Sequence, residues 1–501
     1  MSFTSFQFIL VFMPIAYIGF LLAHRLGGWN WAINFLALTS LAFYSLLPGY
    51  LVLVLVGSML FNYWAGSLLS SLTNSPATAR NTLLGSIALN LGLLGYFKYT
   101  NFFIDVANQF SGSGFAHQDI AVPLGVSFFT FIQIGYLIDA YNGQLIKHNI
   151  ARYVVFAAFF PCVTAGPLVM QREMMSQMED HRQPAFDLRR LVVGLTMFGM
   201  GLFKKVVLAD SIAPYAKQVF DGASSGMAID AGSAWIGALC YTLQLYFDFS
   251  GYSDMAIGLG TVFGIKLPLN FDSPFKSTNI SDFWRRWHMT MTRFFTNYVY
   301  SGLAMNGMRS GAKWQLGPVG RFFLVAGMPS VVTFLVAGVW HGSGWTFVIY
   351  GLMHGFAIAT FLAWREFSGM KLPSIVGWAL TMTTVVFGLV MFNASDVTTA
   401  FTLFSNMLGL GSAGGPHLVL DTAQALSMIV LFGAITQLMP NTQQILHHDW
   451  PTIDTKPITT AIEAGLLAWR PAIGTAFVSA CILTVAITSI GSATNFLYYK
   501  F

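Results

Sequence analysis

Long apolar runs recur along this chain of 501 residues, and they constrain its fold more than any other feature. A helix needs about 20 mainly apolar residues to cross the hydrocarbon core of a bilayer. About twelve stretches approach that length. They lie near residues 6–23, 29–46, 50–72, 82–97, 120–138, 190–209, 233–263, 322–340, 345–364, 374–393, 423–439 and 471–491. The sequence therefore predicts an all-α, polytopic membrane protein with about 11–13 transmembrane or re-entrant helices.

The scarcity of charge agrees with a membrane location. Hydrophobic residues make up 55% of the chain and charged residues 9%, against roughly 25% charged residues in soluble proteins. The net charge of +5 is thinly spread. Disordered, fibrous and nucleic-acid-binding classes are excluded, because they need low hydrophobicity or clustered basic residues. The three cysteines, Cys162, Cys240 and Cys481, have no metal-ligand spacing, so no metal site is predicted.

Basic residues in short loops indicate the orientation. No Lys or Arg precedes the first apolar run, so we expect that run to be the first helix and not a cleaved signal. His24, Arg25 and Arg80 follow the first and third runs, which predicts cytoplasmic loops there and an outside N-terminus. A further basic cluster is expected at the cytoplasmic side; it comprises Arg172, His181, Arg182, Arg189 and Arg190.

Residues 152–166 are expected to form a broken or re-entrant segment, because they contain Pro161 and glycine-bounded breaks. No internal repeat or Ser/Gly-rich linker divides the chain. We therefore expect one membrane-embedded domain over residues 1–501, with its longest loops at 394–422 and 440–470.

Three of the ten histidines lie among Trp, Phe, Met and Gly, namely His288, His341 and His354. An ionisable residue within apolar membrane sequence is costly, so it marks a candidate functional site. Histidine can be buried in its neutral form, which is also the form that a general base requires.

His341 has the neighbours of a pocket residue. Trp340 and Trp345 offer rigid apolar walls. Three nearby glycines allow the helix to break and a ligand to approach: Gly338, Gly342 and Gly344. The structural alternative is a histidine that binds a backbone carbonyl freed at a helix break. His354 lies about 220° further around a continuous helix, so packing against another helix is the favoured interpretation for it.

A second candidate cluster surrounds His288. Asp282 precedes Arg285 and Arg286 by three and four residues, so a helix would pair the acid with both arginines. On the same helix Trp284 would cover the imidazole of His288. One interpretation is an interfacial helix whose arginines lie on anionic lipid. The other has the helix folded inward, with His288 facing a cavity and the arginines facing an anionic donor such as a coenzyme phosphate.

Polar residues interrupt the apolar stretch 241–260, which predicts a broken helix that lines a cavity or holds polar partners. Asp248 and Asp254 lie about 240° apart on a helix, so they should face different partners, with buried arginines favoured over a histidine. The pair Lys204–Lys205 is expected at a cytoplasmic helix end, or alternatively at donor phosphates.

Eight short segments stand out together: "FNYW" (61–64), "LGYFKY" (94–99), "PLGVSFFTF" (123–131), "AGP" (165–167), "LFKKVVLAD" (202–210), "LQLYFDFSGYSDMAIGLG" (243–260), "FWRRWH" (283–288) and "GVWHG" (338–342). In order and spacing they resemble the membrane-bound O-acyltransferase family. The resemblance covers about residues 50–410 and is closest to the bacterial branch that includes alginate O-acetylation, peptidoglycan acetylation and D-alanyl transfer to teichoic acids.

That resemblance implies a ring of tilted helices around a central tunnel, with His341 at its narrowest point and His288 as the second catalytic histidine. It implies no bound cofactor. Acetyl-CoA, or another acyl thioester, would enter from the cytoplasm, and a hydroxyl group would be reached from the other side. The expected tunnel-lining residues are Trp340, Trp345, Trp284, Trp287, Asp248, Ser250, Tyr252, Asp254, Arg285 and Arg286.

The resemblance also implies a multi-pass protein of the bacterial inner membrane, working with a periplasmic acetyltransferase or esterase-fold partner and a polysaccharide synthase complex, with no nucleic acid. The chain departs from the branch at "RFFTNYVY" (293–300), "AMNGMR" (304–309) and "MFNASD" (391–396). The acceptor is therefore left open among alginate, cellulose and other exopolysaccharides. The alternative class is a transporter or flippase of a small solute or lipid-linked intermediate, in which the intramembrane acids and histidines form a solute or proton path.

Overall fold

The computed structural model describes residues 1–46, 49–146, 148–179, 184, 186–411, 416–446, 452–453, 467–470, 472–492 and 496–497. His181, Arg182 and most of the expected 440–470 loop lie outside these residues. The described residues are mainly helical, and their β-structure is limited to isolated bridges. The chain forms two compact units. The first contains Met1–Phe203, Tyr252–Leu269 and Thr442–Lys500, and the second contains Lys204–Gly251 and Asn270–Asn441.

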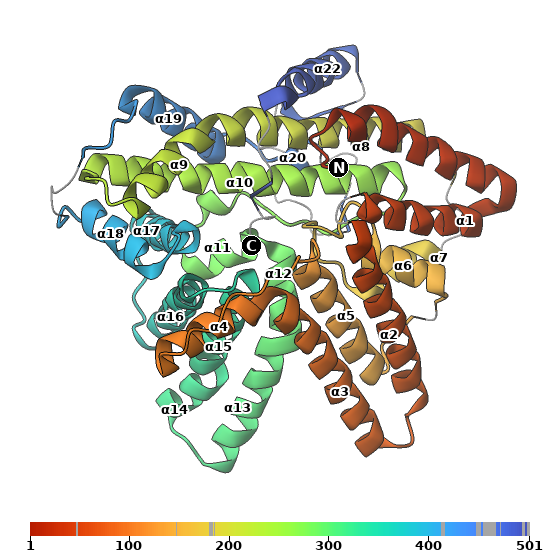
Figure 1. The fold of residues 1–501 in the computed structure, drawn as a ribbon, viewed down its shortest axis with the longest axis horizontal. Coiled ribbons are helices and arrows are strands. Elements are labelled where there is room, and N and C mark those ends of the chain that lie inside the picture. The colour runs from red at the N-terminus through yellow and green to blue at the C-terminus, as the bar shows by residue number, and fades with distance from the viewer. Residues whose placement is uncertain are drawn as a thin grey trace. The chain divides into compact units, whose positions relative to one another are not determined.

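Within the described residues, the first unit contains a set of labelled helices and the end of α10 (Figure 1). They are α1 (Met13–Ser45), α2 (Val52–Ser71), α3 (Pro76–Leu94), α4 (Thr100–Ser111), α5 (Val126–Tyr141), α6 (Ile150–Ala158), α7 (Gln171–Glu179), α8 (Leu188–Phe203), α20 (Thr442–Ile445) and α22 (Ile473–Thr488). Gly28 has φ +73° and divides α1 into two helical segments. This break agrees with the two separate apolar runs expected there.

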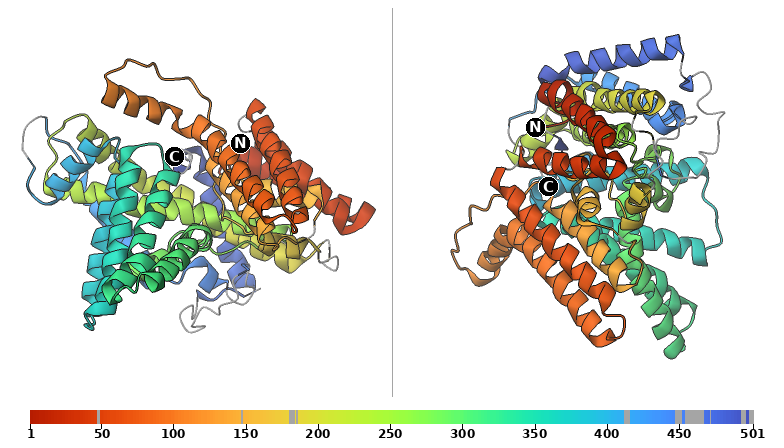
Figure 2. Two further views of the ribbon diagram at one scale, coloured as in Figure 1. Left: turned by 90° about the horizontal axis from the view of Figure 1, so that it is seen from below. Right: turned by 90° about the vertical axis from the view of Figure 1, so that its right-hand side faces the viewer.

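Amide side chains join α2, α3 and α5, which lie side by side (Figures 1 and 2). Asn62 and Asn90 donate to each other at 3.0 and 2.8 Å, and Asn62 also donates to Gln133 Oε1 at 2.8 Å. All three are buried. Interhelical amide hydrogen bonds of this kind hold helices together where lipid supplies little hydrophobic driving force between them.

The expected broken segment is present after α6. The chain leaves the helix at Phe159 and stays non-helical and buried through Val169. Gly125, at φ +73°, lies so close that an added Cβ would be 2.3 Å from the carbonyl oxygen of Val163. Protein therefore covers this irregular backbone, as a membrane environment requires.

The second unit carries α9 (Asp210–Ser224), most of α10 (Ala231–Val262), α11 (Ile280–Arg286), α12 (Met289–Phe295), α13 (Ser301–Lys313), α14 (Pro318–Phe322), α15 (Met328–His341), α16 (Trp345–Phe367), α17 (Ser374–Asn393), α18 (Val397–Met407) and α19 (Thr422–Leu438). The helices α15 and α16 pack through glycines. A Cβ added at Gly338 would lie 2.4 Å from the carbonyl oxygen of Phe347, and one added at Gly351 would lie 2.5 Å from that of Phe334. This close backbone contact fixes His341, at the end of α15, against α16.

The expected break within residues 241–260 is wrong, because α10 is one continuous helix from Ala231 to Val262. Polar side chains are accommodated without unwinding. The hydroxyl groups of Thr242 and Thr261, for example, donate to carbonyls one turn earlier at 2.8 and 2.9 Å.

Six helical stretches in the described part of the chain are long and apolar enough to cross a membrane. They are Phe8–Ser45, Gly49–Ser71, Leu188–Ser224, Pro318–His341, Trp345–Phe367 and Ser374–Asn393, and shorter apolar helices occur at Val126–Tyr141, Thr422–Leu438 and Ile473–Thr488. The predicted all-α, multi-pass membrane architecture is confirmed. The single domain and the N-terminus-out orientation stay predictions.

Candidate active site

His288 lies in a sharp bend between α11 and α12, outside the six candidate spans. Asn279 caps the start of α11 by accepting a hydrogen bond from Asp282 N at 2.8 Å. His288 has φ +45°, in the left-handed region, which costs of order 1–3 kcal/mol for a residue other than glycine. Two backbone hydrogen bonds stabilise the bend: Asp272 N donates to Arg286 O, and Met289 N donates to Asn270 O, both at 2.9 Å.

The side chain of Asn270 fixes the ring of His288. Its Oδ1 atom accepts hydrogen bonds from His288 Nδ1 at 3.0 Å, from Thr290 Oγ1 at 3.0 Å and from Thr290 N at 3.4 Å. The imidazole is 1% exposed, and this burial lowers the pKa of His288 to about 3. His288 is therefore neutral at physiological pH.

We expect acid to weaken folding through His288. An unfolded histidine titrates near 6.5, so between pH 6.5 and about 3 only the unfolded state binds this proton. The stabilising contribution is complete above pH 6.5 and is lost as the pH falls toward 3. Thermal unfolding in detergent at about pH 7.5 and about pH 5 tests this. His288→Gln, which does not titrate, should narrow the difference in midpoint between the two pH values, and an unchanged difference would contradict the expectation.

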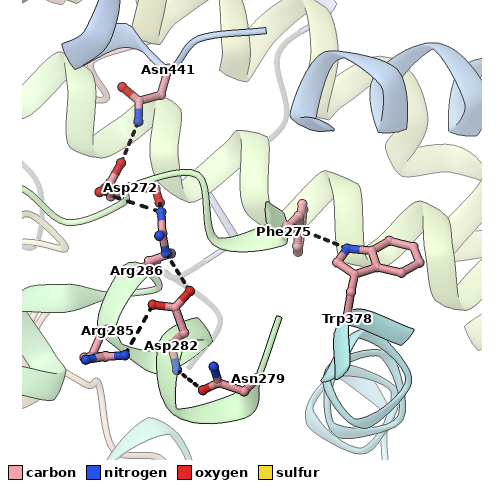
Figure 3. Close-up of polar contacts among 8 residues, drawn as sticks. All are labelled: Asp272, Phe275, Asn279, Asp282, Arg285, Arg286, Trp378 and Asn441. Atoms are coloured by element: carbon pink, nitrogen blue, oxygen red, sulfur yellow. Dashed lines mark hydrogen bonds and ion pairs between the residues drawn. The ribbon is translucent and has the colours of Figure 1, made fainter. Parts of the chain in front are cut away.

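Ion pairs tie the segment before His288 to its surroundings (Figure 3). Arg286 Nε donates to Asp282 Oδ2 at 3.0 Å, and its NH1 group donates to the carbonyl of Asp272 at 3.3 Å. Asn441 in turn donates to Asp272 Oδ1 at 2.9 Å. Asp282 also lies 3.5 Å from Arg285, so the predicted pairing of this acid with both arginines is confirmed.

The structure brings His341 and His288 together. Their ring centroids lie 6.3 Å apart. His341 is buried at the end of α15, and aromatic rings enclose it: Trp340 at 4.8 Å, Phe392 at 5.2 Å and Tyr350 at 6.1 Å between centroids. Trp340 also lies 6.1 Å from the ring of His288. Two buried imidazoles thus share one aromatic pocket.

His354 belongs to a neighbouring packing contact. Trp284 Nε1 donates to His354 Nδ1 at 3.3 Å, with the two rings 5.0 Å apart. A Cβ added at Gly388 would lie 2.3 Å from His354 Nε2, so α17 packs directly on this imidazole. Trp284 therefore covers His354, and the expectation that it covers His288 is wrong, because α11 ends at Arg286 and His288 follows in a left-handed conformation.

Other expected tunnel-lining residues of this unit lie in different surroundings. Trp287 packs in an aromatic cluster with Phe271 and Phe283. Trp345 is 46% exposed at the start of α16, while Ser250 is buried in α10. The side chain of Arg285 is 70% exposed.

Asp248 and Asp254 face different partners, as expected. In the second unit Lys205 Nζ lies 2.6 Å from Asp248 Oδ1 and 2.8 Å from Asp210 Oδ1. In the first unit Asp254 accepts hydrogen bonds from Thr442 Oγ1 at 2.6 Å and Gln443 Nε2 at 3.1 Å.

The expectation that the pair Lys204–Lys205 lies at a cytoplasmic helix end is wrong for Lys205. It is 1% exposed and sits in a π-helical turn, Lys204–Ala209, within a continuous helical stretch. Lys205 pairs with the carboxylate of Asp248 on α10. The partner that the sequence favoured for Asp248 was a buried arginine. Tyr252, which belongs to the first unit, forms a hydrogen bond with Thr164 Oγ1 at 2.5 Å.

A cavity of about 260 Å³ opens between α11–α12 and α15–α16, and its lining residues do not include His288 or His341. Trp284, Arg285, Phe295 and Phe334 are among its walls. The buried hydroxyl oxygens of Thr292 and Thr333 line it and have no hydrogen-bond partner among the described residues. The cavity thus combines apolar walls, hydroxyl groups and the cation of Arg285.

Sequence reasoning missed Asn270, Tyr350 and Phe392. Phe392 lies in the segment "MFNASD", which differed from the expected motif. Asn270 and Tyr350 carry no local signal, because they reach the histidines only through folding. Among the described residues, no group of three or more His, Cys, Asp or Glu side chains is placed to hold a metal ion.

Comparison with known proteins identifies the family of this chain. Residues 100–403 match the family model described as MBOAT, membrane-bound O-acyltransferase family. The peptidoglycan O-acetyltransferase of Helicobacter pylori is 36% identical over 84% of this chain and 82% of its own length. The probable alginate O-acetylase AlgI of Pseudomonas aeruginosa is 34% identical over 82% of this chain and 76% of its own.

A more distant relative is the teichoic acid D-alanyltransferase of Streptococcus thermophilus, 26% identical over 55% of this chain and 69% of its own length. The family match spans both short helices that flank His288 and the whole of α15 and α16. The chain therefore belongs to the membrane-bound O-acyltransferase family and is a multi-pass membrane acyltransferase.

Proposed function

We propose that this chain is an O-acetyltransferase that passes acetyl groups across the bacterial inner membrane for modification of an exopolysaccharide. The observation that carries the proposal is the buried pair His288 and His341, with ring centroids 6.3 Å apart in an aromatic pocket. The names of the relatives support the reaction type, because peptidoglycan O-acetyltransferase and alginate O-acetylase are both O-acetylating proteins.

In the proposed reaction His341 acts as the general base. Its neutral imidazole takes the proton of an acceptor hydroxyl while that oxygen attacks the carbonyl carbon of an acetyl thioester. The tetrahedral intermediate collapses with cleavage of the C–S bond. The imidazolium of His341 then returns the proton to the departing sulfur, so the products are an acetyl ester and a free thiol. The surrounding rings of Trp340, Tyr350 and Phe392 keep water away from the thioester.

Acetyl-CoA, or another acetyl thioester, is the proposed donor. The cavity between α11–α12 and α15–α16 suits the arm of such a thioester, which alternates methylene groups with amides and ends in a phosphate. Its aromatic walls can cover the methylenes, and the hydroxyls of Thr292 and Thr333 can bind amides. Arg285, exposed at the same cavity, can bind phosphate.

The acceptor is a polysaccharide such as alginate or cellulose, reached directly or through a periplasmic acetyltransferase or esterase-fold partner. A polysaccharide synthase complex is the expected source of that polymer. The proposed transfer path is a tunnel through one membrane domain, and the tunnel connects the cytoplasmic donor to the far side of the membrane.

Mass spectrometry of the secreted polymer tests the proposed function. Cells that lack the gene should produce polymer without O-acetyl groups, and complementation with the intact gene should restore them. A polymer that keeps its acetyl groups in the deleted strain would overturn the proposal. Ion-driven solute transport by the purified protein, without release of thiol from acetyl-CoA, would instead support a transporter.

A further inference from the structure

The orientation of the His288 ring carries a consequence for its role in the proposed reaction. An amide oxygen can only accept a hydrogen bond. Asn270 Oδ1 lies 3.0 Å from His288 Nδ1, and the same oxygen accepts from the backbone N–H of Thr290 at 3.4 Å and its hydroxyl at 3.0 Å. Because a backbone N–H can only donate, these contacts identify the atom as oxygen. His288 Nδ1 must therefore carry the proton.

We infer that Asn270 is a positioning residue that holds His288 as the Nδ1–H tautomer, so that His288 meets the substrates as a hydrogen-bond acceptor through Nε2. A neutral imidazole has one N–H group, and Asn270 receives it. His288 then accepts a hydrogen bond from an N–H or O–H group of a substrate, and it does not donate one to the developing oxyanion. This inference rests on the proposed acetyl transfer and specifies the part His288 plays in it.

The fold around Asn270 is built to maintain this arrangement. Asn270 is fully buried. Its backbone carbonyl accepts from Met289 N at 2.9 Å, so one residue holds both the bend at position 288 and the imidazole. Phe249 packs edge-on against the same ring, with centroids 4.7 Å apart. A ring flip would break the hydrogen bond to Oδ1 and disturb this packing.

The charges around His288 allow the neutral tautomer to persist. A titratable group in ring contact with His288 is His341 on α15, with 6.3 Å between the ring centroids. Two further rings that pack on it, Phe249 of α10 and Trp340 of α15, carry no charge. The ion pairs of Asp282 and Asp272 are made with Arg286, two residues earlier.

Nitrogen NMR on the full-length protein labelled with ¹⁵N-histidine tests the tautomer directly and needs no activity. The His288 signal is assigned by its loss in His288→Gln. We expect a protonated Nδ1 and an unprotonated Nε2 in the wild type. In Asn270→Leu we expect a mixture of tautomers. A wild-type ring protonated at Nε2 would overturn the inference, whereas the proposed function would be untouched.

Kinetics of thiol release from acetyl-CoA in the presence of polysaccharide supply the second readout. Asn270→Leu should lower kcat at least about tenfold with little change in KM for the donor. Asn270→Asp keeps an acceptor oxygen and should restore most of kcat, while its negative charge moves the acid limb of the pH–rate profile to higher pH. Thr290→Val is the matched control, because it removes a bond to the same oxygen and leaves His288 in place. Equal losses in all three variants would contradict a positioning role.

Discussion

Replacement of His341 by alanine is expected to abolish polymer acetylation while the protein stays in the membrane. The proposed role of His341 is to take the acceptor proton, and general-base catalysis contributes typically about 10²–10⁴ in rate. Its aromatic enclosure by Trp340, Tyr350 and Phe392 does not depend on a charge at this position. The measurement is the O-acetyl content of secreted polymer from complemented cells, with protein abundance determined in the same membranes.

Two further variants make this result specific. His341→Gln retains a polar side chain of similar volume, so it separates loss of the base from loss of packing. His117→Ala removes an exposed imidazole that pairs with Asp105, and it should leave acetylation unchanged. Wild-type acetylation in His341→Gln and His341→Ala would show that His341 is not the base.

Lys205→Met is expected to prevent stable folding. The ammonium group of Lys205 lies between Asp248 and Asp210, at 2.6 and 2.8 Å, and its side chain is 1% exposed. Methionine fills a similar volume but removes the ammonium group that lies between the two buried carboxylates. Loss of one partner from a buried ion pair costs about 3–5 kcal/mol. Expression and size-exclusion chromatography in detergent should show little folded, monodisperse protein.

Lys217→Met is the matched control for that variant. Lys217 also pairs with an aspartate, Asp221, but its side chain is 78% exposed. Exposed ion pairs contribute about 0–1 kcal/mol, so this variant should fold normally. The double variant Lys205→Met with Asp248→Asn should recover part of the folded yield, because one buried charge is then removed. Equal yields of Lys205→Met and wild type would contradict a stabilising role for the buried lysine.

Apolar run length predicted most of the fold because it reports the length of a membrane-spanning helix directly. It predicted the helices α2, α10, α16 and α17 with bounds close to those observed. The expectation that failed came from the polar residues within 241–260, whose side chains find partners without breaking the helix. Ser250 and Gly251 suggested a break, yet α10 passes through them without interruption.

The sequence predicted individual residues of the candidate site, but it did not predict how they contact one another. His341 and His288 stand out by their aromatic neighbours in the sequence. Helical spacing predicted that Trp284 covers His288, and this was wrong because His288 adopts a left-handed backbone conformation. A histidine in the sequence does not indicate that conformation. Asn270 lies 18 residues before His288, and the bond between them depends on how the loop folds back.

The glycine contact between α15 and α16 also limits how the site can move. Backbone atoms meet at Gly338 and Gly351 without room for even a methyl group, so the two helices must travel as one rigid body. We therefore expect His341 and Tyr350, which these helices carry, to keep a constant separation. If the pocket opens for the proposed acceptor, we therefore expect the movement at the opposite wall, where the short helices α11 and α12 meet at the bend of His288.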